Sequence, residues 1–191
     1  MKMKRKLFLT AALMLLAGFG VQAGETSAYD LIRSGDQFVG VQSKDKVVQI
    51  RSEKSIGSLV PNIWYIVYYD PDATFKSVEV KFGAGEKLDV THPWRVLELA
   101  GDDHSVLDAS KLRVDSDRAI RIATSQPLLE NLKLSATQLW LDHGDNGPQW
   151  RVKIWALRVK NSQEDADVGV VILSAADGSI VKIDLHPNSA D

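Results

Sequence analysis

The chain has 191 residues, a formal net charge of −2 at pH 7 and no cysteine. A mildly acidic chain lacks the basic field that drives nucleic-acid binding, so nucleic acid is excluded as a partner. Without cysteine there is no disulfide framework, no thiolate catalysis and no cysteine metal site. A hydrophobic core must therefore hold the fold, and a composition that is 45% hydrophobic can form one.

Residues 1–23 have the three regions of a secretory signal peptide. Basic residues lie within positions 2–6, and an uncharged apolar run follows over 7–19. This run is short for a transmembrane helix, which needs about 20 apolar residues. We expect cleavage between Ala23 and Gly24, a mature chain that does not insert into the membrane, and a periplasmic or secreted location in a bacterium. An uncleaved membrane anchor is the alternative.

Two stretches, 45–54 and 117–126, have similar chemistry at matching positions. Each begins with an aspartate and a basic residue and continues with apolar residues three apart, such as Val47 and Ile50. This spacing places apolar side chains on one side of a helix. The two stretches therefore predict a short amphipathic helix in each half of the mature chain.

Both predicted helices are followed by stretches rich in β-branched and aromatic residues, which strands prefer. Each predicted strand of the first half has a counterpart in the second half. The stretch 63–69 corresponds to 150–155, 78–82 to 168–172, and 87–90 to 182–185. An insertion at 128–148 in the second half could add a strand or a short helix. The sequence thus predicts an α+β fold of two tandem helix-on-antiparallel-sheet units, over 24–105 and 106–191.

The second half resembles a PepSY-type domain. The resemblance is carried by the capped stretch at 116–126, the strand at 150–154, and the Asp177-Gly178 turn into the last strand. The first half is similar more loosely, because it has Gly83-Ala84-Gly85 where an Asp-Gly turn is usual. The family implies a small α+β module linked with peptidase regulation or inhibition and with ligand sensing at the cell envelope. It implies no catalytic residues.

No catalytic or metal constellation stands out in the sequence. The four histidines, at positions 92, 104, 143 and 186, do not have metal-ligand spacing. Two acidic loops, around Asp70 and around Asp142, lack the alternating oxygen ligands of a calcium site and are more typical of turns. Serine-nucleophile and phosphate-loop motifs are absent. We therefore expect no catalytic residue, no metal and no cofactor.

Aromatic residues cluster in the predicted strand at 63–69. If Trp64 points into the core, Tyr65 and Tyr69 point to the opposite face, since side chains alternate along a strand. In the second half, the corresponding outward residues are Arg151, Lys153 and Trp155. Aromatic rings beside cations suit an acidic, partly apolar protein or peptide partner. The competing possibility is that the insertion covers this face.

The leading function is a non-enzymatic exported binding or inhibitory module, acting on an envelope or secreted peptidase or on another envelope protein. A hydrolase-like enzyme with a pocket between the two repeats is one alternative, and convergent titratable side chains would indicate it. A structural envelope component is the other.

Overall fold

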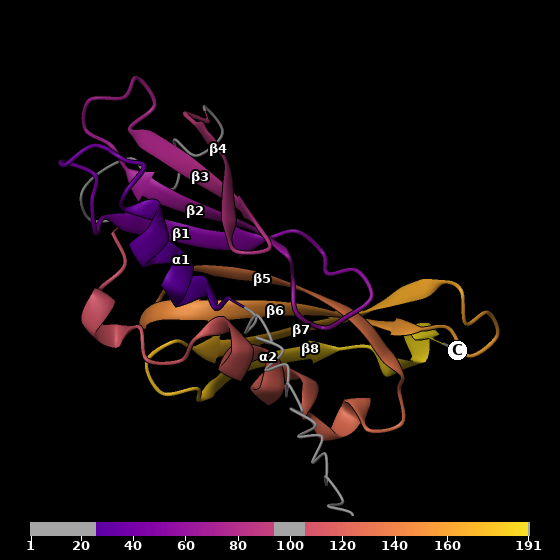
Figure 1. The fold of residues 1–191 in the computed structure, drawn as a ribbon. Helices are drawn as coiled ribbons and strands as arrows, with labels where there is room; N and C mark the ends of the chain where they lie inside the picture. The colour runs from indigo at the N-terminus through magenta and orange to yellow at the C-terminus, as the bar shows by residue number, and fades with distance from the viewer. Residues whose placement is uncertain (1–25, 94–105, 191) are drawn as a thin grey trace, which may run out of the picture.

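The protein forms one eight-stranded antiparallel sheet in a computed structural model, which describes residues 26–93 and 106–190 (Figure 1). The expected signal peptide and His104 lie outside the described residues. The strand order is β4-β3-β2-β1-β5-β6-β7-β8. The first four strands are β1 Val47–Ser52, β2 Ile63–Tyr69, β3 Ser77–Gly83 and β4 Glu86–Thr91. The last four are β5 Leu134–Gly144, β6 Gly147–Leu157, β7 Asp165–Ser174 and β8 Ile180–Leu185.

Two short α-helices pack on one face of this sheet. They are α1 Ala28–Gly35 and α2 Ser116–Thr124, and three 3-10 turns complete the described elements: η3 Ala109–Lys111, η4 Pro127–Leu129 and η5 Pro187–Ala190. Leu31 of α1 and Ile120 of α2 belong to the same buried cluster as Trp64 and Trp150 of the sheet. None of the helices in the described part of the chain is long and apolar enough to cross a membrane.

The predicted fold class of two tandem helix-on-sheet units is wrong, because the strands join into a single sheet. Ile50 and Arg51 of β1 pair with Leu141 and Trp140 of β5, which connects the first four strands to the last four. The segment at 45–54 contains strand β1, where a helix was expected. Within the described part of the chain, the two α-helices have eight and nine residues, so the sheet dominates there.

A β-bulge explains the wrong helix prediction at 45–54. The register between β1 and β2 shifts between Val47 and Gln49. Val47 and Ile50 therefore lie on the same face although they are three residues apart, and both belong to the core cluster. A spacing of three is also the spacing of a helix face, so the pattern alone favours the wrong element.

Other predicted elements are confirmed. The strand expected at 63–69 is β2, and the helix expected at 117–126 is α2, with Asp115 capping its first turn. Trp64 and Trp150 are 2% and 0% exposed, as their predicted inward orientation requires. The insertion at 128–148 supplies η4 and β5, so it becomes a central strand and does not cover the sheet.

Hydroxyl groups extend the contact between β1 and β5 beyond their two paired residues. The backbone N–H of Leu139 donates to the buried Ser52 hydroxyl at 2.9 Å. The N–H of Thr137 donates to the Ser55 hydroxyl at 2.9 Å, and the N–H of Ser55 donates to the Thr137 carbonyl at 2.8 Å. These bonds satisfy backbone groups that would otherwise be buried without partners where the strands diverge.

The two helices are tied together at their N-termini. The N–H of Ala28 donates to the Ser116 hydroxyl at 3.0 Å, so the start of α2 caps the start of α1. Tyr29 stacks on Trp150 with ring centroids 6.1 Å apart, and both side chains donate to the Val114 carbonyl. We call the sheet face that carries these helices the inner face and the opposite side the outer face.

Candidate functional site

The outer face carries all five residues that the sequence singles out. Tyr65 and Tyr69 alternate with the core residues of β2, and Arg151, Lys153 and Trp155 alternate with those of β6. Tyr65 and Arg151 occupy the same transverse row of the sheet, because Arg51 and Trp140 lie between them in register. That the five residues bind a partner stays a prediction.

The transverse row alternates cations with large apolar side chains across seven strands. Strand pairing places its members directly opposite one another from β3 to β8. In order, the row contains Lys81, Tyr65, Arg51, Trp140, Arg151, Ile172 and Lys182. We call this set the cation–aromatic row.

At one end of the row, Tyr65 lies beneath two cations. The Arg51 guanidinium is 3.8 Å from the ring centroid, and the Lys81 ammonium is 5.1 Å from it. The Tyr65 hydroxyl donates to Glu53 at 2.5 Å, and this hydrogen bond, with help from Lys81, lowers the pKa of the Glu53 carboxyl. Arg51 also forms an ion pair of 2.6 Å with the buried Glu79. Each cation is therefore held by a ring and a carboxylate together.

Trp155 forms a second cluster of the same kind beside the row. The ammonium groups of Lys54 and Lys153 are 4.7 and 5.1 Å from the centroid of its ring. Lys54 pairs with Asp165 at 2.8 Å, which lowers the pKa of that carboxyl, and Lys153 pairs with Asp167 at 2.7 Å. A hollow of about 420 Å³ opens next to Lys54 and Asp165. Lys54 thus contacts the Trp155 ring and also lines the hollow.

Tyr69 has different surroundings from Tyr65. It packs with Val106 against Val48 and Val67, which are both buried although they lie outside the main core. The Lys46 ammonium is 5.5 Å from the Tyr69 ring centroid. Tyr69 therefore contributes to a small hydrophobic cluster, whereas Tyr65 and Trp155 are anchored mainly by charged neighbours.

Sequence reasoning missed Arg51, Lys81 and Trp140 as members of the face. Arg51 was assigned to a helix, so its partner across the sheet could not be inferred. Trp140 lies between the buried Leu139 and Leu141. This alternation in the sequence could have indicated that Trp140 points outward.

Asp142 is the carboxylate on this face whose pKa is raised. Burial raises the pKa of its side chain, and Arg151, 3.8 Å away, and His143 only partly oppose the shift. Arg151 itself is 47% exposed and has no closer carboxylate among the described residues. Within the cation–aromatic row, Arg151 is thus a cation with much of its guanidinium accessible to a partner.

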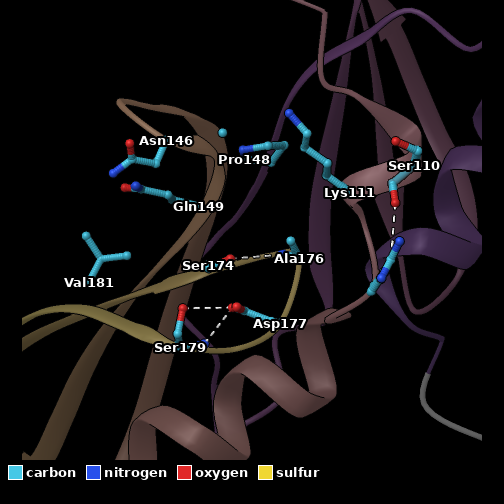
Figure 2. A pocket seen from close by; sticks show the side chains of 12 residues that line it. Ser110, Lys111, Asn146, Pro148, Gln149, Ser174, Ala176, Asp177, Ser179 and Val181 are labelled. Carbon is cyan, nitrogen blue, oxygen red and sulfur yellow. Dashed lines mark hydrogen bonds between the residues drawn. The ribbon is translucent and has the colours of Figure 1, made fainter.

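A polar hollow of about 570 Å³ lies at one end of the sheet (Figure 2). It is lined by η3, the β5–β6 hairpin and the β7–β8 turn. Asp177 in this turn accepts hydrogen bonds from the Ser179 N–H and hydroxyl, which lower the pKa of its carboxyl. An ionised turn carboxylate of this kind is a poor general base, and the described lining residues include no histidine.

Among residues 26–93 and 106–190, no three histidine, aspartate or glutamate side chains converge as metal ligands do. Comparisons of the chain with protein-family models, with curated proteins and with solved structures gave no match. The resemblance to PepSY-type domains therefore rests on the sequence motifs alone.

Proposed function

We propose that this protein is a non-enzymatic binding module that docks a protein or peptide partner on the outer face of its sheet. The proposal includes export, expected from residues 1–23, so the partner is an envelope or secreted protein. A peptidase is the partner class that the PepSY resemblance suggests.

The cation–aromatic row is the observation that carries the proposal. Tyr65 in this row and Trp155 beside it each lie against two cations that are paired with carboxylates. Rigid aromatic side chains lose little conformational entropy on binding, and they are the usual anchors of protein interfaces. A flat array of such anchors suits a partner surface better than a small substrate, which needs an enclosing pocket.

The charges of the face favour a partner with both apolar and acidic groups. Most of its cations already have carboxylate partners, as Arg51 has Glu79 and Lys153 has Asp167. Long-range attraction by net positive charge is therefore small, and the contact must depend on apolar area. Arg151, which is half exposed beside Trp140, is the group that would reach a carboxylate of the partner.

A site-specific photo-crosslinking experiment tests the proposal. A benzoylphenylalanine residue replaces Trp140 on the outer face, and a matched chain carries it at Phe38. Phe38 is an exposed aromatic that packs against the inner-face residue Phe82 and has a lysine near its ring. Exported protein is irradiated in intact cells. We expect a defined crosslinked species from position 140 and none from position 38.

Alanine substitutions then measure the contribution of each ring to binding of the crosslinked partner. Tyr65→Ala, Trp140→Ala and Trp155→Ala should each weaken binding by about 2 kcal/mol, or roughly thirtyfold, as interface hot spots do. Phe38→Ala should leave binding unchanged. If position 140 gives no species that position 38 lacks, or if all three variants bind like the wild type, the outer face is not the docking surface.

A further inference from the structure

Strand β8 forms one border of the sheet. Among the residues that the structure describes, it pairs with β7 on one side and with no strand on the other (Figure 1). Its apolar residues Ile180, Val181 and Ile183 are 40%, 50% and 43% exposed. A free strand edge presents unpaired backbone donors and acceptors, and natural proteins usually protect it. An exposed edge with three aliphatic side chains is therefore suited to pairing with another strand.

The charges of β8 are complementary to a second copy of the same strand. Lys182 and Asp184 flank Ile183, and both point to the outer face, opposite Ile172 and Val170 of β7. When two copies pair antiparallel about Ile183, each Lys182 lies opposite Asp184 of the second copy. Oppositely charged residues that face each other across strands are stabilising, and like charges are destabilising. The same register brings the two Ile183 side chains together on the inner face.

We propose that the protein forms a two-fold symmetric homodimer through antiparallel pairing of its β8 strands. The contact closes on itself, because the same strand serves both copies. It joins the two sheets at their β8 borders and leaves the outer face of each copy accessible. A single pair of short strands forms a small interface, so the dimer is weak and forms with rising concentration.

The other border of the sheet offers a rival contact. Strand β4 contains Lys87 and Asp89 around the exposed Leu88, which is the same order of residues as in β8. Pairing of β4 with β8 of another copy would leave one edge free on each chain, so assembly would continue beyond a dimer. We favour β8 because it exposes three aliphatic residues, whereas the exposed aliphatic in β4 is Leu88 alone.

Sedimentation velocity over a micromolar concentration series tests the dimer with charge-swapped variants. The dimer contains two facing pairs of positions 182 and 184. In a dimer of Lys182→Glu, both pairs consist of two carboxylates, and in a dimer of Asp184→Lys both pairs consist of two cations. Each variant alone should dimerise at least about tenfold more weakly than the wild type. An equimolar mixture of the two should restore the dimer, since every facing pair is then of opposite charge. The double variant Lys182→Glu/Asp184→Lys should also dimerise.

Lys87→Glu is the control for the rival contact, and it should dimerise like the wild type. Thermal melts of all variants establish that each one folds, so a monomer is not mistaken for unfolded chain. The proposal is overturned if the wild type stays monomeric throughout the series, if the mixture fails to restore the dimer, or if Lys87→Glu weakens association as Lys182→Glu does. Species larger than a dimer would also overturn it.

Discussion

The two faces of the sheet use aromatic residues in opposite ways. On the inner face, the polar atoms of buried rings bond to backbone carbonyls: Trp150 to Val114 at 2.6 Å, Trp64 to Pro61 at 2.9 Å and Tyr68 to Ile32 at 2.9 Å. On the outer face, rings are half-buried and contact charged side chains, as Tyr65 contacts Arg51.

This difference indicates where stability and recognition reside. A buried ring with a satisfied polar atom contributes its full apolar area to folding. A half-exposed ring between charged side chains contributes less to folding and keeps area that a partner can bury. The inner face should therefore tolerate substitution poorly, and the outer face should tolerate it well at all but its most buried positions.

The largest effect is expected at Trp150. Trp150→Ala removes a fully buried ring, its hydrogen bond to Val114 and its stacking with Tyr29, and should lower the free energy of unfolding by about 3–5 kcal/mol. Trp64→Ala should fall in the same range. Urea unfolding measures both losses. The outer-face control, Trp140→Ala, should lose no more than about half as much free energy of unfolding. Losses below about 1 kcal/mol at both inner-face positions would contradict the assigned core.

Arg51 is the outer-face position where we expect a substantial loss. Glu79 is 7% exposed, so Arg51→Met leaves its carboxylate largely buried without its cation. We expect a loss of about 2 kcal/mol in the free energy of unfolding, below the value for a fully buried pair because a third of Arg51 is exposed to water. Adding Glu79→Gln should recover part of the loss. If Arg51→Met unfolds like the wild type, the buried Glu79 carboxylate does not need the Arg51 cation for the stability of the fold.

Two tyrosines of β2 allow a direct comparison of the faces. Tyr68→Phe removes the hydroxyl donor to the Ile32 carbonyl, which keeps its hydrogen bond from the N–H of Asp36, and should cost about 1 kcal/mol. Tyr65→Phe removes an exposed hydrogen bond to Glu53, and should change stability by less than about 0.5 kcal/mol. Chemical denaturation of the two variants side by side gives the answer. Equal losses would remove the energetic distinction between the faces.

The smallest effect concerns the pH dependence of stability at Asp142. Burial raises the pKa of the Asp142 carboxyl in the folded state. The contribution of Asp142 to stability therefore falls as the pH rises from the ordinary aspartate pKa through the raised pKa. Asp142→Asn should therefore be slightly more stable than the wild type at pH 7, with the difference vanishing in acid. Thermal melts between acidic and neutral pH measure the difference.

Asp177 is the control, because the pKa of its carboxyl is shifted in the opposite direction. Hydrogen bonds from Ser179 lower the pKa of its carboxyl, so its contribution is present at neutral pH and is lost as pH falls through the lowered value. Asp177→Asn should be less stable than the wild type at neutral pH and should converge with it in acid. A shift of the same sign in both variants would mean that the two carboxyls do not have the opposite environments described here.

Much of the candidate face could be predicted because strand alternation is a local property. Once β2 is recognised from its β-branched and aromatic residues, a buried Trp64 places Tyr65 on the other side. The same reasoning places Arg151 and Trp155 away from the core in β6. Helix α1 was missed although Ser27 and Asp30 form a recognisable N-terminal cap, in which the N–H of Asp30 donates to the Ser27 hydroxyl.

The joining of the two groups of strands could not be predicted. The sequence by itself determined which residues alternate in β2 and β6, the position of α2 and the inward placement of Trp64 and Trp150. Only the tertiary structure decided that residues 47–52 form a strand, because the bulge in β1 imitates helical spacing and pairing with β2 and β5 overrides it. That pairing joins residues about 90 positions apart in the chain, Arg51 and Trp140, and local patterns carry no information on contacts at such separation.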